Sequence, residues 1–218
     1  MSEVRELQYV VLTLKDHDDV THFLVNHFYP RDNIIIGSRC SRKTALSVDH
    51  KHIQMCLTSG LSTGARDKTT KNLVAVMLSC NYKYCFEAPQ NPEDEVGILR
   101  VRHKIRKLMD EVVDTRKDRI VFCTRICVHP DYGHQGVATK IMKLCLNLST
   151  KQGFTLACGD TSNPNTERIC LRLGFKNVKA VKVNTLEEGI FDLSPINYKI
   201  LKFFTKRLEP ETILSSKL

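Results

Sequence analysis

The sequence predicts an α/β (α+β) fold built on a mixed sheet, in a single domain over residues 1–218. Short apolar runs that are typical of strands alternate along the chain with segments whose apolar residues recur at helical spacing. Near the centre, a buried-strand pattern at residues 119–128 leads through a glycine-containing loop into a helical pattern. This alternation, without an internal repeat or a linker, favours one sheet flanked by helices.

The first half of the chain begins with a predicted short strand at 8–14 and a helix with an acidic first turn at 16–28. Pro30 cannot continue that helix, so the segment 28–33 is predicted to break it. The predicted elements that follow are a helix at 47–57, a polar turn region linking short strands at 60–72, a strand at 73–80, a loop at 87–95 and a helix at 98–113.

The second half has the more regular pattern. After the strand at 119–128, a helix is predicted at 137–150 and a strand at 154–160. A helix that ends at Gly174 comes next, since glycine commonly terminates helices. Strands at 180–184 and 197–208 complete the prediction.

Composition excludes several classes of protein. The N-terminus has acidic residues instead of the positive charge of a signal peptide, and the apolar runs are too short to span a bilayer. We therefore expect a cytoplasmic protein without a membrane partner. Nine cysteines without framework spacing predict reduced, mostly buried thiols. The close pairs, Cys80/Cys85 and Cys123/Cys127, are not CxxC and nothing completes a zinc set, so no metal is expected.

The net charge of +9 fits either a nucleic-acid-binding protein or one whose ligand is a multiply charged anion. Lys and Arg are spread over the chain, and no zinc finger, RNA-recognition signature or basic arm is present. Nucleic acid is therefore not an expected partner. The protein is expected to be a monomer.

The loop HPDYGHQGVATKIM, 129–142, contains the most informative motif. A helix N-terminus leaves backbone N–H groups unpaired and carries partial positive charge, which suits a phosphate that approaches closely. Gly136 and Ala138 leave room for that approach, and Thr139 adds a hydroxyl donor. An ordinary strand-to-helix turn explains the loop equally well. Neither GxxxxGK[ST] nor GxGxxG is present, which argues against a nucleotide hydrolase or a Rossmann enzyme.

The combination of motifs resembles the GNAT superfamily of acetyl-CoA-dependent N-acetyltransferases. That family has Arg/Gln-x-x-Gly-x-Gly/Ala at a strand-to-helix junction, where 133–138 reads GHQGVA here. Its later helix closes on Leu-Gly-Phe, as 173–175 does. The segment HFYPRDN, 27–33, is similar to the Phe-Phe-x-x-x-Glu-Pro segment of insect arylalkylamine N-acetyltransferases, and two hydroxyl residues four apart, Ser162 and Thr166, match their later helix. The resemblance covers roughly residues 7–208.

The resemblance implies the GNAT fold, with a mostly antiparallel sheet and a splayed central strand. It also implies transfer of acetyl from acetyl-CoA, the cosubstrate, to a small primary amine of the arylalkylamine type, without a metal. Asp32 would be the general base, assisted by Ser162 and Thr166, and Phe28 and Tyr29 would contact the amine. The residues expected to bind coenzyme A are Ile126, Cys127, Val128, His134, Gln135, Gly136, Val137, Ala138, Thr139 and Arg168.

Three positions depart from the family pattern. Gly133 replaces the first Arg/Gln of the loop, so positive charge is expected from His134 or Lys140 instead. Asp32-Asn33 replaces Glu-Pro, which shortens the catalytic carboxylate by one methylene. Cys170 stands where many relatives outside the insect group have a tyrosine that acts as the general acid.

Alternatives remain open for individual residues and for the activity. Asp32 could cap a turn or pair with Arg31, Ser162 could cap the next helix, and Arg168 could lie on a solvated helix face. A polyamine acceptor would need further carboxylates, for which Asp49, Glu93 and Glu95 are candidates. The alternative functions are a divergent acetyl-CoA binder without turnover and a protein or peptide acetyltransferase.

Overall fold

Seven strands form one sheet in the computed structural model, which describes residues 6–85 and 97–209. The strand order is β1-β2-β3-β4-β5-β7-β6, and β4 and β5 are the parallel pair among neighbours that are otherwise antiparallel. The strands are β1 Leu7–Val11, β2 Thr63–Asp67, β3 Leu73–Asn81, β4 Ile120–Val128, β5 Leu156–Thr161, β6 Lys176–Lys182 and β7 Ile200–Arg207. The predicted fold class, a mixed and mostly antiparallel sheet flanked by helices, is confirmed.

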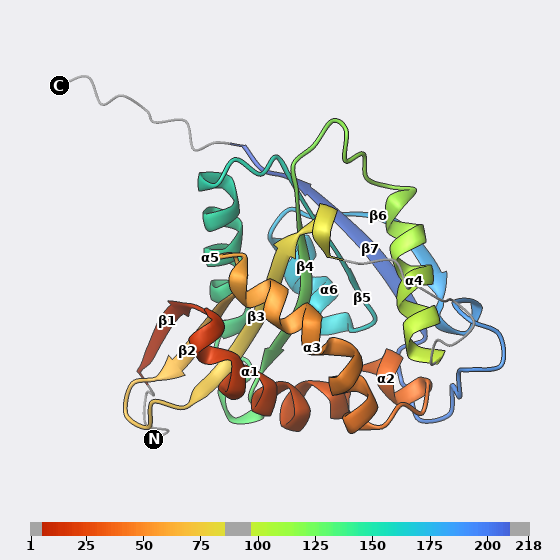
Figure 1. Cartoon of the computed structure of the whole chain (residues 1–218), viewed down its shortest axis with the longest axis horizontal. Coiled ribbons are helices and arrows are strands. Elements are labelled where there is room, and N and C mark those ends of the chain that lie inside the picture. The colour runs from red at the N-terminus through yellow and green to blue at the C-terminus, as the bar shows by residue number, and fades with distance from the viewer. Residues whose placement is uncertain (1–5, 86–96, 210–218) are drawn as a thin grey trace.

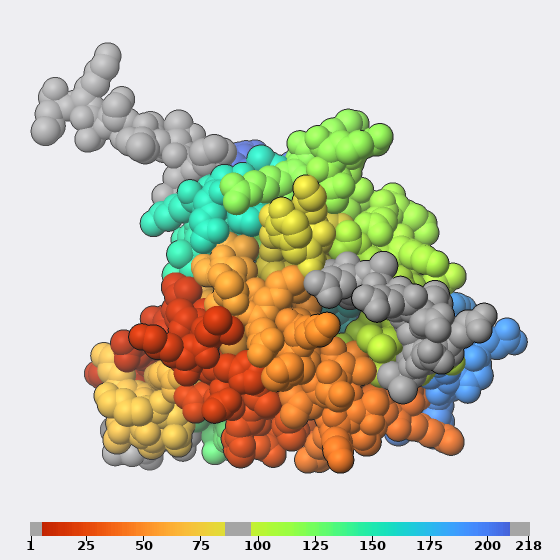
Figure 2. All heavy atoms as spheres, viewed as in Figure 1, coloured from red at the N-terminus to blue at the C-terminus, as the bar shows by residue number. Residues whose placement is uncertain are grey.

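Helices cover both faces of this sheet (Figure 1). One face carries α1 His17–Phe23, α2 Asn33–Gly37, α3 Arg42–Thr58 and α4 Gly97–Asp110, and the other carries α5 Val137–Lys151 and α6 Pro164–Arg172. Figure 2 shows α1, α2 and α3 as a continuous cover over the near face, with α4 beside them. Among the described residues, no helix has both the length and the apolar character needed to cross a bilayer.

The hydrophobic core consists of two clusters, one on each face of the sheet. Leu78 and Phe122 belong to the cluster under α1 to α4, whereas Met77 and Val121 belong to the cluster under α5 and α6. This division follows from the alternation of side chains along β3 and β4. It explains why both strands are nearly continuous apolar runs in the sequence.

The two central strands separate toward their carboxyl ends (Figure 1). β4 and β5 pair only as far as Cys123 and Gly159, although both continue beyond these residues. A bulge at Thr124 shifts the register of β4 against β3, and such a bulge bends its strand. A Cβ on Gly159 would lie 2.8 Å from the Cys123 carbonyl oxygen, so glycine permits the close approach just before the strands part. The splayed central strand is therefore present.

Most predicted elements are found with shifted ends. The helix predicted at 16–28 is α1 followed by a π-helical turn over Leu24–Phe28, and the predicted break is a 3-10 turn at Tyr29–Arg31. The turn region at 60–72 contains a full strand, β2. The predicted strand at 180–184 begins earlier, as β6, and ends where Val183–Thr185 forms a 3-10 turn. The loop predicted at 87–95 lies outside the described residues.

Candidate active site

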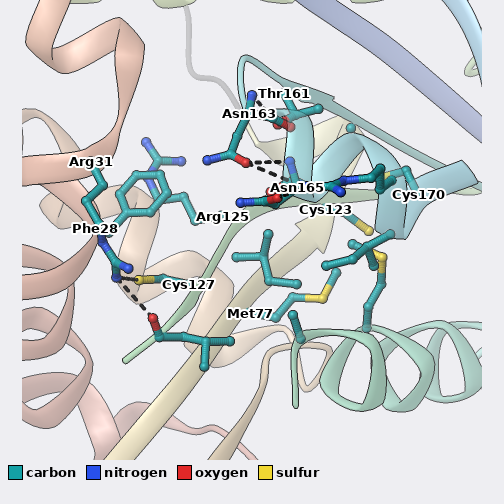
Figure 3. A pocket seen from close by; sticks show the side chains of 18 of the residues that line it. Phe28, Arg31, Met77, Cys123, Arg125, Cys127, Thr161, Asn163, Asn165 and Cys170 are labelled. Atoms are coloured by element: carbon teal, nitrogen blue, oxygen red, sulfur yellow. Dashed lines mark hydrogen bonds between the residues drawn. The ribbon is translucent and has the colours of Figure 1, made fainter. Parts of the chain in front are cut away.

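A cavity of about 820 Å³ occupies the gap between the separating ends of β4 and β5. Figure 3 shows that Phe28 and Arg31 lie on one side of it and that Met77, Cys123 and Cys170 lie on the other. The first group belongs to the α1–α4 face of the sheet and the second to the α5–α6 face. The cavity therefore connects the two faces through the sheet.

The loop before α5 forms part of the wall on the α5–α6 face. Gly136 has φ +74° at the N-cap of α5, and His134 has φ +59°. No atom lies within 4 Å of the place where a Gly136 Cβ would stand, and no side chain caps this helix end. The first backbone amides of α5 therefore remain available to a ligand in the cavity.

The structure separates the predicted coenzyme A residues of this loop into two groups. The cavity is lined by His134, Gly136, Ala138 and Thr139. Val137 instead is buried in the core at 2% exposure, and Gln135 donates its side-chain amide to the Asp131 carbonyl at 3.3 Å. Lys140 lies over the ring of Tyr9, so His134 is the one of the two expected basic residues that faces the cavity.

The free edge of β4 supplies a second group of backbone donors. The His129 amide donates to the Val74 carbonyl at 2.8 Å, on the β3 side. Because the direction of N–H groups alternates along a strand, the amides of Ile126 and Val128 point to the opposite edge, toward the split. Consistent with this direction, the Val128 carbonyl accepts a 3.1 Å hydrogen bond from Arg31. Ile126, Cys127 and Val128, which are expected to bind coenzyme A, all line the cavity.

Asp32 lies at the N-terminus of α2 and lines the cavity from the α1–α4 face. Its carboxylate caps the helix by accepting from the Ile35 amide at 2.9 Å. Asp32 therefore both caps α2 and lines the cavity. Arg31 is not its partner: that guanidinium bonds the Cys127 sulfur at 3.0 Å and the Val128 carbonyl. Burial raises the pKa of Asp32.

Behind this wall lies a buried ionic cluster of Asp49, Arg102 and Arg125. Arg125 binds Asp49 through Nη2 at 2.7 Å and Nε at 3.2 Å, and it also lines the cavity. Although burial alone would raise it, the charges of Arg102 and Arg125 hold the pKa of Asp49 at about 2. Tyr29, 1% exposed, donates its hydroxyl to Asp49 at 3.0 Å and is not among the residues lining the cavity. Of the two aromatic residues predicted to contact the amine, Phe28 alone does line it.

Ser162 and Thr166 both line the cavity, near the end of β5 and the start of α6. The helix is capped by Asn163, whose side chain accepts from the amides of Asn165 and Thr166, so Ser162 is not the cap. The main-chain carbonyl of Ser162 accepts a 2.6 Å hydrogen bond from the Asn33 side chain. This bond joins the beginning of α2 to the end of β5 across the cavity.

Two further residues of α6 were singled out by the sequence. Arg168 lines the cavity, is exposed and contacts the Asn165 side chain. Cys170 also lines it, at 7% exposure, and burial raises its pKa to about 12. Cys170 is therefore a neutral thiol near pH 7 and a weak acid.

Asp160 is a cavity residue that the sequence does not predict. It lies on the same face of β5 as Leu156 and Cys158 and so faces the α1–α4 side, beyond the point where β4 leaves β5. Burial raises the pKa of Asp160 to about 7, the charge of Arg125 opposes the rise, and that of Asp32 adds to it. The signal in the sequence is an acidic residue near the carboxyl end of an apolar strand, but its relation to Asp32 is tertiary.

Three potential ligands of a soft metal also lie together. The donor atoms of His52, Cys56 and Cys80 lie within 4.8 Å of one another. A structural zinc site has four such ligands. Burial raises the pKa of Cys56 well above its usual value, which is the state of a thiol packed in a core. The expectation of no metal remains a prediction.

Comparison with known proteins agrees with this geometry. The model of the acetyltransferase (GNAT) family matches residues 82–175. The structure of a mosquito arylalkylamine N-acetyltransferase-like protein 5b superposes with a TM-score of 0.78 at 17% identity, over 93% of this chain and 100% of that one. Arylalkylamine N-acetyltransferase 2 from Aedes aegypti gives 0.73 at 18% identity, over 94% and 100%. A polyamine N-acetyltransferase from Drosophila melanogaster that forms N-acetylagmatine gives 0.76 at 12% identity, over 93% and 100%. No curated protein matches the sequence.

The chain has the fold of solved N-acetyltransferases, with a split central sheet, and its residues 82–175 match the model of the GNAT family. At identities below 20%, the solved structures establish its fold and leave the acceptor to be argued from the cavity.

Proposed function

We propose that this protein transfers the acetyl group of acetyl-CoA to the primary amine of a small arylalkylamine-type substrate, in the cytoplasm and as a monomer. One observation carries the proposal: a single cavity joins a helix N-terminus with free amides on one face of the sheet to carboxyl groups on the other. The first side suits a phosphate-bearing cosubstrate and the second suits an ammonium ion.

The cosubstrate side is formed by backbone more than by side chains. The amides that follow Gly136 would hold the pyrophosphate, with His134, Thr139 and Arg168 as further donors around it. Acetyl-CoA supplies the acetyl thioester. The amides of Ile126 and Val128 would orient the pantetheine arm and donate to the thioester carbonyl as negative charge develops on its oxygen.

The amine must lose a proton before it can attack the thioester directly. An alkylamine has a pKa near 10.4, so freeing its lone pair near neutral pH costs on the order of 4 to 5 kcal/mol. Asp32 would take this proton as the general base, directly or through a water. Its raised pKa brings it closer to that of the ammonium and so reduces the mismatch.

The thiolate leaving group needs less catalytic assistance than the amine. A thiolate has a pKa of about 8.5, so its release does not need a strong acid. Cys170, with a pKa of about 12, is a weaker acid than the thiol that forms and would not protonate it. Ser162 and Thr166 would orient a water, or the thiol itself, as the thiolate departs.

The acceptor side favours a monoamine with an apolar body. Phe28, Ile34 and Leu201 line it. Asp49, a candidate third carboxylate for a polyamine, is fully buried and already paired with two arginines. Glu93 and Glu95 lie outside the described residues. A polyamine or agmatine acceptor remains the second candidate, because structures of enzymes with those acceptors share the fold.

The first experiment is detection of acetylated product by mass spectrometry, with phenethylamine-type, indole-type, imidazole-type, polyamine and peptide acceptors. We expect turnover of a small monoamine that falls at least about 100-fold in Asp32→Asn, the usual range for loss of a general base. Acetyl-CoA binding without turnover of any acceptor would instead identify a divergent binder. Turnover restricted to peptides would identify a protein acetyltransferase.

A further inference from the structure

Two carboxyl groups, not one, face the acceptor end of the cavity. Asp32 comes from the start of α2 and Asp160 from β5, and both line the cavity. They are near enough for the charge of Asp32 to act on Asp160. The Asn33 bond to the Ser162 carbonyl holds their two elements together, since Asn33 follows Asp32 and Ser162 lies two residues beyond Asp160.

The surrounding charges favour a state in which Asp32 and Asp160 together hold one proton. Among the described groups that act on Asp160 are Asp32 from α2, Arg125 from β4 and Arg102 from α4. The two arginines already share Asp49 between them, which leaves one positive charge uncompensated. One ionised carboxyl balances that charge, and the second is balanced by a proton. Arg31 directs its guanidinium away, to the Cys127 sulfur and the Val128 carbonyl.

We propose that Asp160 is a second catalytic residue, and that Asp32 and Asp160 form a carboxyl pair that binds the acceptor ammonium and takes its proton. This inference rests on the proposed function and deepens it. It identifies the acceptor as a compound that brings one positive charge to this pair, which is the chemistry of a primary monoamine. Within this pair the proton that the proposed function assigns to Asp32 alone is taken by Asp160, and Asp32 positions the ammonium from its fixed place as a helix cap.

The arriving ammonium replaces the proton shared by the carboxyls, which leaves to water, and Asp160 is then ionised. One N–H bond of the ammonium breaks and its proton moves to Asp160. The amine nitrogen forms a bond to the acetyl carbon, the carbon–sulfur bond breaks with its electron pair on sulfur, and the second nitrogen proton ends on that sulfur. Asp160 keeps this proton when the product leaves, which restores the pair with its one proton, so each turnover releases one proton to water.

The location of Asp160 agrees with this role. On β5 it shares a face with Leu156 and Cys158, on the side of the sheet where Phe28 and Ile34 also lie. The split between β4 and β5 opens directly beside it, because pairing ends at Gly159. A base at this position would lie beside the gap between β4 and β5, where the amine and the thioester would meet. Burial and the neighbouring carboxyl bring its pKa to about 7, near the working pH that suits a general base.

The test measures kcat/KM against pH for the intact wild type, Asp160→Asn, Asp32→Asn and the control Asp18→Asn, whose side chain is fully exposed on α1. The probe amine is the monoamine turned over fastest in the acceptor panel. For Asp160→Asn we expect a loss of at least about 100-fold at pH 7, an unchanged KM for acetyl-CoA, and no acidic limb near pH 7. Asp160→Glu should restore part of the rate.

Asp32→Asn gives the readout that a merely structural role would not produce. Removing the negative neighbour should move the acidic limb to lower pH, because Asp32 raises the pKa of Asp160. Two results would overturn the inference and leave the proposed function intact. One is a turnover by Asp160→Asn within threefold of the wild type, and the other is an acidic limb of the pH profile that does not move in Asp32→Asn. No turnover by the wild type would overturn both.

Discussion

The side-chain amide of Asn33 donates to the main-chain carbonyl of Ser162 at 2.6 Å and to that of Tyr198 at 3.2 Å. These bonds join the start of α2 to the ends of two other segments that are more than 120 residues away in the chain. The family pattern has proline at this position, which stiffens the chain but has no donor. Asn33 therefore holds this segment through hydrogen bonds to distant parts of the chain, whereas a proline would stiffen it locally.

Asn33→Ala should loosen the side of the cavity that carries Asp32. Two buried or half-buried carbonyls lose a donor, so we expect a stability loss of about 1 to 3 kcal/mol. Turnover of the amine should fall about tenfold with an unchanged KM for acetyl-CoA, which steady-state kinetics and urea unfolding can measure. Asn26→Ala is the control, because Asn26 is exposed and bonds only within its own helical segment, to His22. Equal effects in the two variants would show that the tertiary bond has no special role.

Gly136→Ala should weaken cosubstrate binding for two reasons: it strains the backbone, and it adds a methyl group where the cosubstrate would approach. An alanine at φ +74° costs roughly 1 to 2 kcal/mol, and its methyl group would stand at the helix end that faces the cavity. We expect the KM for acetyl-CoA to rise about tenfold or more. Gly189→Ala is a matched control: it has φ +73° and open space around its Cβ position, as Gly136 has, but it does not line the cavity. It should lose similar stability and keep the wild-type KM.

Asp49→Asn should be the most destabilising of these changes. It leaves Arg102 and Arg125, which are 15% and 13% exposed, without their carboxylate, and loss of one partner of a buried pair typically costs about 3 to 5 kcal/mol. Asp192→Asn, at the more exposed pair with Arg39, should cost less than about 1 kcal/mol. Urea unfolding of both variants measures the contrast, and comparable losses would contradict the buried-cluster assignment.

The same cluster predicts the acid limit of the fold. The folded pKa of Asp49, about 2, lies below its usual value of 3.8, so its contribution is complete above pH 4 and is lost as the pH falls toward 2. Asp49→Asn should therefore unfold with a weaker pH dependence between pH 4 and 2 than the wild type. Equal slopes would show that Asp49 does not set the acid limit.

Asp160→Asn should stabilise the protein at alkaline pH. The folded pKa of Asp160, about 7, lies above its usual value of 3.8, so ionisation opposes folding increasingly as the pH rises from about 4 to 7. Because solvent reaches part of this carboxyl, we expect a gain on the order of 1 to 2 kcal/mol at pH 8 and little change at pH 4. Thermal unfolding at the two pH values measures this difference. A destabilised variant at pH 8 would mean that Asp160 is held by favourable bonds.

The sequence predicts the parts of this protein whose signal is local. The loop around Gly136 is recognisable because its glycine, its small neighbours and the helix start are consecutive in the chain. Asp32 was identified through the resemblance of its segment. The strand β2 was recognised only as short strands beside turns, because its polar residues mask the pattern of a strand that is buried on both faces.

Tertiary relations account for what the sequence did not predict. Tyr29 resembles a substrate contact next to Phe28, but Asp49, twenty residues on, accepts its hydroxyl in the core. In the sequence Asp160 is the polar end of a strand, and only the fold places it on the same cavity as Asp32. Two carboxyls from segments so far apart produce no spacing motif.

Under the proposed function, the early end of the β4–β5 ladder would couple the folding of this protein to its cosubstrate. Beyond Cys123 and Gly159, no strand in residues 6–85 or 97–209 pairs with the edge that carries the Ile126 and Val128 amides. A bound pantetheine arm would serve as a guest strand and complete the ladder. These amides should exchange rapidly with deuterium in the free protein and slowly in the complex. A ligand at 100 times its Kd would also stabilise the whole domain by about 2.7 kcal/mol. The melting temperature is then a direct reporter of cosubstrate occupancy.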